Sequence, residues 1–300
     1  MTRRTRNVSS AGAKWPLAQR HFELFVLSHI DADHIGGSVP FMEAAPELGI
    51  TVGDVWFNGW KHIKAYESLV KGLDMLGAKQ GEIFSAQLER IQWPWNRWQN
   101  GSAIVAPDKG TLPTCTLPGG MLLTLLSPSA SKLAALAAGW RKDLADKGLQ
   151  PGEGEQFLAK AAGTRSTDVA ALAGAAFKPD AAENNGSSIC LLAEFAGKRV
   201  LLGADGHAPL LVKSIQRLLK ARGLQRLPLD AFKLPHHGSR NNVDASLVEQ
   251  VDCRRHKRLP GLRDLARSCD LRNLPATPPQ HDDRHHRAQC KDTEGTETWK

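Results

Sequence analysis

The sequence lacks any long uninterrupted run of apolar residues. A helix that crosses a bilayer needs about 20 such residues, and the mean hydropathy of this chain is −0.33, so the sequence predicts no membrane span. The basic segment of residues 1–20 also lacks the apolar stretch of a secretory signal. We therefore expect a cytoplasmic protein.

Cysteine is scarce as well. The five cysteines are odd in number and none stands in a Cys-x-x-Cys pair: Cys115, Cys190, Cys253, Cys269 and Cys290. A disulfide framework needs an even, regularly spaced set, whereas scattered thiols are typical of a reducing compartment. We expect free thiols.

Negative charge is in the minority, because 39 Lys and Arg face 31 Asp and Glu, a formal net charge of +8. Such a balance favours anionic partners such as DNA, RNA or phosphorylated substrates. Much of the excess lies at the two ends of the chain. Three hundred residues, 41% of them hydrophobic, are enough for one large domain with a buried core.

Short apolar segments alternate with helically spaced ones along residues 21–250. Strands are predicted at residues 22–27 (buried), 54–57, 121–126 and 231–234, with a hairpin formed by 187–195 and 199–202. Helices are predicted at residues 38–48, 129–147 and 210–221. This alternation indicates a layered α/β core.

Composition divides the chain into three parts. Residues 1–20 are predicted to be a disordered basic leader, and residues 251–300 a basic tail of low order. The domain between them contains a helical insertion at about residues 58–180. The last part of this insertion, residues 151–180, has few large apolar side chains and is predicted to pack loosely.

The strongest chemical signal is the segment SHIDADHIGG at residues 28–37. It places four potential metal ligands directly after a buried strand, so that His29 and Asp31 can serve one ion while Asp33 and His34, on the turn, reach a second. Imidazole with carboxylate suits Zn²⁺, Mn²⁺ or Fe²⁺. The two final glycines let the backbone turn tightly. The alternative interpretation is a solvated turn capped by Asp33.

This segment resembles the metal-binding motif of the metallo-β-lactamase superfamily. Asp31 replaces the second histidine of the usual pattern, a variant similar to the hydrolase domain of ComEC-type DNA-uptake proteins and their soluble relatives. The resemblance implies an αββα sandwich and a two-metal centre. It covers roughly residues 22–251.

Two later segments agree with the resemblance. After the strand at residues 199–202, Gly203-Ala204-Asp205 stands where the family has Thr-Gly-Asp, and the resemblance implies that Asp205 bridges both metals. In Pro235-His236-His237-Gly238, it implies that His236 completes the second metal site. His237 is then expected near the substrate as a proton donor or phosphate contact.

Further residues are assigned to substrate binding. Ser239 and Arg240 are placed to contact an anionic substrate group. His62, the only other histidine between the two halves of the site, is interpreted as a pocket or lid residue, with metal ligation as the alternative.

The expected function is metal-dependent hydrolysis, with two divalent ions (Zn²⁺ or Mn²⁺) activating a water molecule. Asp33 or Asp205 orients that water and takes its proton, and His237 or solvent protonates the leaving group. The carboxylate at position 31 hardens the site and, with the basic charge, favours phosphodiesters of DNA or RNA over lactams. The alternatives are a nucleic-acid-binding protein without turnover and an inactive fragment of such a hydrolase.

The resemblance also raises a hypothesis about the ends. Family members begin with two further strands and continue past residue 251 with a strand and a final histidine-bearing segment, neither of which we recognise in this sequence. A late start codon and a frame shift would account for both differences, and resequencing the locus would test this.

Overall fold

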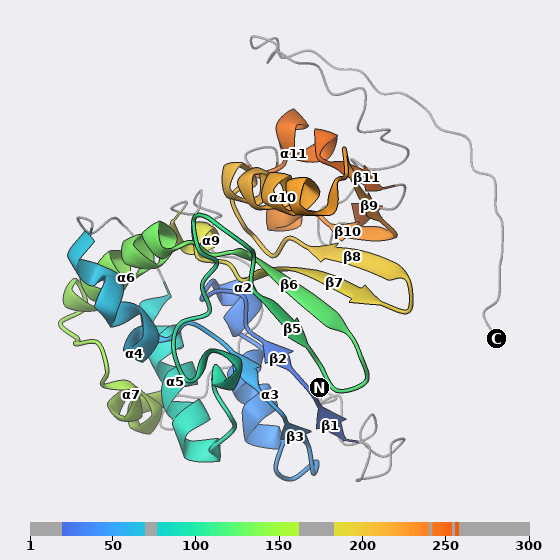
Figure 1. Cartoon of the computed structure of the whole chain (residues 1–300). Helices are drawn as coiled ribbons and strands as arrows, with labels where there is room; N and C mark the ends of the chain where they lie inside the picture. Colours follow the sequence, from blue (N-terminus) through green and yellow to red (C-terminus); the bar gives the residue numbers. More distant parts are fainter. Residues whose placement is uncertain (1–19, 70–76, 162–182, 240–241, 254–255, 258–300) are drawn as a thin grey trace, which may run out of the picture. The chain divides into compact units, whose positions relative to one another are not determined.

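The computed structural model describes residues 20–69, 77–161, 183–239, 242–253 and 256–257. By their contacts, the described residues all belong to one compact unit. Helices and strands alternate through this unit (Figure 1), so the α/β class expected from the sequence is confirmed. None of the helices described is both long and apolar enough to cross a bilayer.

The largest sheet has six strands. Their order is β12 (His256–Lys257), β10 (Ala231–Lys233), β8 (Lys198–Leu202), β7 (Cys190–Phe195), β6 (Leu122–Ser127) and β5 (Thr114–Thr116). Strands β8, β10 and β12 run parallel, whereas β5 to β8 pair antiparallel. The predicted hairpin is β7–β8. Ala196 and Gly197 at its tip have φ of 48° and 73°, as a tight two-residue hairpin turn requires.

A parallel ladder forms from the N-terminal strands. It pairs β1 (His21–Phe22) with β3 (Thr51–Val52), and β2 (Phe25–Val26) with β4 (Val55–Trp56). The predicted buried strand at residues 22–27 is present as two short strands, β1 and β2, and is buried only toward its end: Phe22 is 44% exposed, whereas Leu27 is 3% exposed and lies in the core.

Strand pairing also continues past residue 250. β11 (Val251–Cys253) runs parallel to β9 (Leu227–Leu229), and β12 follows it. The low-order tail predicted from residue 251 thus begins with two short strands. Residues 1–19 and 258–300, the remainder of the predicted leader and tail, lie outside the described residues.

The helices are α2 (Ala32–Ile35), α3 (Ser38–Ala44), α4 (Trp60–Ile63), α5 (Ala78–Ile91), α6 (Ala130–Ala145), α7 (Gly154–Ala161), α9 (Glu183–Gly186), α10 (Ala208–Arg222) and α11 (Ala245–Glu249), with 3₁₀ turns η2 (Lys64–Leu69), η3 (Arg97–Gln99) and η4 (Pro235–Gly238). The predictions at 129–147 and 210–221 match α6 and α10 closely. The helix predicted at 38–48 ends early, at Ala44. Ala45 still has helical backbone and donates to the Phe41 carbonyl, but Pro46 has no N–H with which to continue the helical hydrogen bonds.

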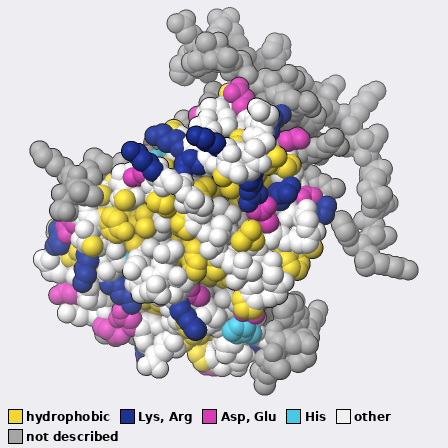
Figure 2. Space-filling view, viewed as in Figure 1, with side chains coloured by type: hydrophobic (Ala, Val, Ile, Leu, Met, Phe, Trp, Pro, Cys, Tyr) yellow, Lys and Arg dark blue, Asp and Glu magenta, His cyan; other side chains and the backbone are white. Residues whose placement is uncertain are grey.

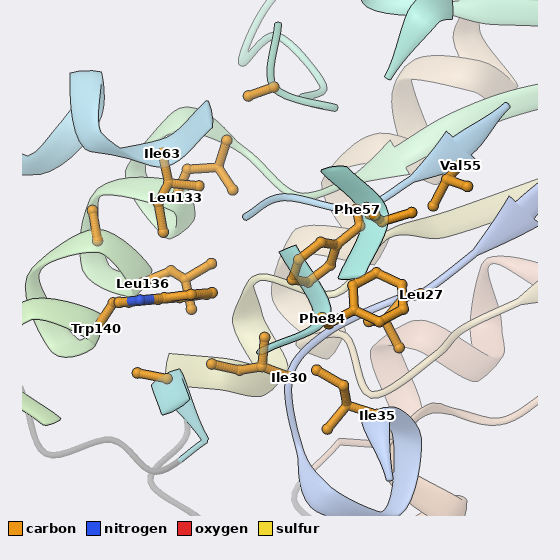
Figure 3. Close-up of a cluster of buried hydrophobic side chains, with 14 of the residues drawn as sticks. Leu27, Ile30, Ile35, Val55, Phe57, Ile63, Phe84, Leu133, Leu136 and Trp140 are labelled. Atoms are coloured by element: carbon orange, nitrogen blue, oxygen red, sulfur yellow. The ribbon is translucent and has the colours of Figure 1, made fainter. Parts of the chain in front are cut away.

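The hydrophobic core lies between the N-terminal ladder and helices α5 and α6. Figure 3 shows Phe57 beside Phe84 of α5, with Leu133 and Trp140 of α6 on one side and Val55 on the other, and these side chains are fully buried. Residues 58–161, predicted as insertion, thus supply part of this core and also strands β5 and β6 of the main sheet. Residues 162–182, the rest of that predicted insertion, lie outside the described residues.

Candidate metal centre

The loop that follows β2 carries the four predicted ligands. Asp31 has extended backbone (φ −65°, ψ 146°) and forms the N-cap position of α2, which contains Asp33 and His34. His29 and Asp31 are buried, whereas the Asp33 side chain is 58% exposed. The predicted tight turn is found at Gly36 alone. Both glycines have ordinary φ (−59° and −89°), but a Cβ at Gly36 would lie 2.6 Å from the Ala32 carbonyl oxygen, whereas one at Gly37 would meet nothing.

Ser28 orients both imidazoles of this loop. Its Oγ lies 3.1 Å from Nδ1 of His29 and 3.3 Å from Nδ1 of His34. The hydroxyl has one proton, so it can donate to one ring and must accept from the other. At least one ring therefore carries its proton on Nδ1 and presents a bare Nε2. Such an orientation is the usual state of a metal-binding histidine.

The Nε2 atoms of both histidines are buried and make no hydrogen bond. Each nevertheless faces a carboxylate: Nε2 of His29 lies 3.4 Å from Asp31 Oδ2, and Nε2 of His34 lies 3.3 Å from Asp205 Oδ1. Buried polar atoms are nearly always hydrogen-bonded in folded proteins. A divalent cation between imidazole and carboxylate would satisfy both groups, so these residues fit a metal.

Asp205 reaches this loop from the end of β8. Its backbone N–H donates to Ser188 Oγ (3.3 Å), and its carbonyl accepts from Asn242 Nδ2 (3.2 Å). Lys233 on the neighbouring strand β10 places Nζ 3.2 Å from Asp205 Oδ1. Burial, the largest influence, would alone raise the pKa of Asp205, but the contact with His34 and the nearby positive charges hold that pKa below its usual value.

Three residues close to Asp205 have strained backbone. Ala204 has φ of 40°, and His236 and His237 have φ of 44° and 53°, all in the left-handed region that costs non-glycine residues about 1–2 kcal/mol each. Strain of this kind persists where the surrounding structure enforces it, often at functional sites.

The two adjacent histidines have different surroundings. His237 Nε2 lies 2.8 Å from Asp33 Oδ2 and 3.8 Å from Asp205 Oδ2. His236 instead has Nδ1 within hydrogen-bond distance of Asn185 Nδ2 (3.2 Å) and Asn242 Oδ1 (3.1 Å). The structure therefore brings His237, rather than the predicted His236, to the other candidate ligands.

Two groups of three could each hold an ion. His29, His34 and Asp205 form one, and Asp33, His34 and His237 the other, with the ligand atoms of each group within 4.8 Å of one another. Asp31 adjoins the first group, and its other oxygen, Oδ1, accepts a hydrogen bond from Asn184 Nδ2 (2.7 Å). Of the six predicted ligands, only His236 is not placed with the rest.

Neither of the predicted substrate residues that the structure describes, His62 and Ser239, belongs to these groups. His62 is buried, with its ring edge-on to Trp95 at 4.5 Å. The Ser239 backbone N–H donates to the carbonyl of His236 (2.8 Å), so Ser239 follows the site directly, whereas Arg240 lies outside the described residues. Whether any of the three contacts a substrate stays a prediction.

Several positioning residues were not assigned a role from the sequence: Ser28, Asn184, Asn185, Lys233 and Asn242. Ser28, Asn184 and Asn185 stand beside predicted ligands or strands, and this position was the sequence signal for their role. Metal-binding histidines and carboxylates need hydrogen-bonding partners of this kind. Asn242 had no such signal.

Comparison with known proteins adds no assignment. The chain matches no protein-family model, and a search of curated proteins finds no match. The function has to be argued from the geometry above.

Proposed function

We propose that this chain is a metal-dependent hydrolase of the metallo-β-lactamase type, similar to the ComEC-like branch, which binds two divalent cations and cleaves phosphodiesters. One observation carries the proposal. Three segments far apart in the sequence (residues 29–34, Asp205 and His237) converge on buried imidazole Nε2 atoms of His29 and His34 that have no hydrogen bond.

The sharing of His34 decides how the ligands are divided. Its Nε2 belongs to both groups, yet one nitrogen lone pair binds one ion. We assign His29 and Asp31 to the first ion, and Asp33, His34 and His237 to the second. Asp205 groups with His29, a ligand of the first ion, and its Oδ2 lies 3.8 Å from Nε2 of His237, a ligand of the second, so it would be the candidate bridge between the ions.

The mixture of nitrogen and oxygen donors limits the metal. The six assigned ligands are three histidines and three carboxylates, a harder set of donors than an all-histidine site. Such a set suits Mn²⁺ as well as Zn²⁺. Cations bound here would lower the pKa of a water molecule and neutralise charge on a phosphodiester, the chemistry of two-metal hydrolysis.

The exposure of the ligands indicates where a substrate would enter. The side chains of His29 and Asp205 are 0% and 3% exposed, whereas those of Asp33 and His237 are 58% and 27% exposed. A substrate would therefore approach the Asp33–His237 side. Asp33 is the exposed carboxylate on that side, and since its Oδ2 faces the other ligands of the second ion, its remaining oxygen Oδ1 would be the proton acceptor. Because His237 is assigned to a metal, protonation of the leaving group falls to solvent.

The expected αββα arrangement belongs to the same proposal. The N-terminal ladder and the six-stranded sheet would be its two sheets. Ser28 at the end of β2 accepts a backbone hydrogen bond from Ile189 at the start of β7 (3.0 Å), which links them at the metal loop. Ser214 of α10 donates to Leu126 of β6 (2.7 Å), so one helix covers the larger sheet.

Metal analysis with a matched pair of variants tests the proposal. Asp205→Asn removes the candidate bridge, and Asp230→Asn removes an exposed carboxylate that pairs with Lys198 on the same sheet. We expect about two Zn²⁺ or Mn²⁺ per wild-type chain and hydrolysis of bis(p-nitrophenyl) phosphate and DNA. Asp205→Asn should lower activity on the order of 100-fold, and Asp230→Asn should leave it unchanged. A wild-type protein without metal affinity, or equal activity in both variants, would refute the proposal.

A further inference from the structure

We propose a second site, separate from the metal centre, that binds a phosphate monoester. It is a cavity of about 780 Å³ between the loop of residues 108–112, strands β5 and β6, and the C-terminal half of α10. This volume lies in the range of small-molecule pockets. Because α10 begins three residues after Asp205, its cavity-lining turns, Arg217–Arg222, are roughly 15–20 Å farther along the helix at 1.5 Å per residue.

One wall of the cavity is clamped in place by Arg217. Its guanidinium donates to the carbonyl of Pro107 (2.6 Å) and twice to that of Gly110 (2.6 and 3.2 Å). These bonds tie the loop of residues 108–112 to α10, so the cavity is formed before any ligand binds. A guanidinium satisfied by neutral carbonyls keeps its full positive charge.

The lining is strongly cationic. Among the described residues Lys109, Arg217 and Lys220 have no carboxylate partner, whereas Arg222 is neutralised by Glu194 (2.6 Å). Of the described residues that line the cavity, Asp108 alone is acidic. Figure 2 shows Lys and Arg side chains gathered over the part of this face where Figure 1 draws α10. Three cations to one carboxylate match the charge of a phosphate monoester, which is between −1.5 and −2 at pH 7.

The C-terminal end of α10 carries a partial negative charge that repels an anion. A helix carries about half a negative charge at its C-terminus. Lys220 lies in its last turn and offsets that charge, and Lys109 and Arg217 keep the balance in the cavity positive.

The floor of the cavity contains a hydroxyl that lacks a partner. Thr124 on β6 is 1% exposed and its Oγ1 makes no hydrogen bond. Thr114 faces it across the β5–β6 ladder and also lines the cavity. An unsatisfied buried hydroxyl costs stability. A ligand oxygen that accepts from Thr124 would remove this cost.

The remaining lining indicates the rest of the ligand. Leu112, Leu218 and Ala221 supply apolar surface, and none of the described residues that line the cavity is aromatic. A nucleobase would have no ring to stack on. The geometry therefore favours a phosphate group on a small aliphatic body. The same phosphate chemistry also occurs at the 5′ end of a nucleic-acid strand.

Titration of the full-length protein with glycerol 3-phosphate tests the proposal, and a 5′-phosphorylated dinucleotide distinguishes the two sources of phosphate. Lys220→Gln removes a lining charge, and Lys213→Gln removes an exposed lysine of α10 that does not line the cavity. We expect Lys220→Gln to weaken glycerol 3-phosphate binding on the order of tenfold or more. Lys213→Gln should have no effect. Binding of the dinucleotide alone would assign the phosphate to a strand end.

In Thr124→Val, phosphate binding and the thermal midpoint of the free protein should not fall together. Removal of the hydroxyl should weaken phosphate binding while the thermal midpoint of the free protein stays equal or rises, because an unsatisfied buried group is lost. No binding of either phosphate to the wild type, or equal weakening by Lys220→Gln and Lys213→Gln, would overturn the proposal. A fall in the midpoint of free Thr124→Val would also contradict it.

Discussion

At the scale of single residues, the centre is built from ordinary side chains held in unusual backbone. Ala204 precedes Asp205 with φ of 40°, and the histidine pair that follows β10 lies in the same left-handed region. The His236 N–H donates to the Ala204 carbonyl (3.1 Å), so the two strained segments hold each other. This strained backbone orients Asp205 and His237 toward the loop after β2.

Ala204→Gly tests this interpretation. Glycine tolerates positive φ, which removes about 1–2 kcal/mol of strain, but it loses about 0.5–1 kcal/mol more conformational entropy on folding. We expect the free energy of unfolding in denaturant to rise by about 1 kcal/mol. Ala196→Gly, at φ 48° in the β7–β8 turn, should give a similar gain far from the centre. A loss of stability in Ala204→Gly alone would contradict the strain assignment.

At the scale of elements, parallel neighbouring strands bring the centre together. β8 and β10 pair in register, so Asp205 and the histidine pair leave the sheet at the same edge, where ligands commonly bind in α/β proteins. The hydrogen bond between Ser28 and Ile189 brings the end of β2 to the same place. Each predicted ligand follows a strand, which is why sequence position alone located most of them.

Ser28→Ala tests the role of the β2–α2 junction. The variant removes the hydroxyl that contacts both Nδ1 atoms, and loss of such a partner lowers metal affinity about 10- to 100-fold. Competition with a chromogenic chelator measures this affinity. Ser38→Ala is the matched control, since Ser38 Oγ contacts only the backbone carbonyl of His34 at 3.5 Å. Equal affinity in the two variants would remove Ser28 from the centre.

At the scale of the whole molecule, a second buried histidine ties stability to pH. His62 has neither ring nitrogen hydrogen-bonded. Burial, with a smaller contribution from the neighbouring charge of Lys61, lowers its pKa from 6.5 to about 4. Between these values the unfolded chain binds a proton at His62 and the folded chain does not, so folding loses stability as the pH falls.

The expected size follows from the shift in pKa. Stability from this residue should be complete above pH 6.5 and should decline by about 3 kcal/mol by pH 4. Denaturant unfolding of the wild type and of His62→Leu between pH 4 and 7 measures it, because the difference between the two curves isolates His62. Parallel curves across this range would show that the folded protein admits the proton, and the assignment of a low pKa would be wrong.

The sequence by itself determined the α/β class, the β7–β8 hairpin and five of the six residues now placed at the centre. These features are local: alternating apolar residues form strands, and polar residues directly after a strand lie at the sheet edge. The extent of the core was harder to predict. Helices α5 and α6 and strand β6 fell in a predicted insertion, because composition does not reveal which apolar faces meet.

Only the tertiary structure decided between His236 and His237. Both follow the same strand and both suit a metal, so neither spacing nor residue type separates them. Their positive φ values turn His237 toward Asp33 and leave His236 between Asn185 and Asn242. The supporting contacts of Ser28, Asn184 and Lys233 were decided in the same way, because they join segments that meet only when the chain folds.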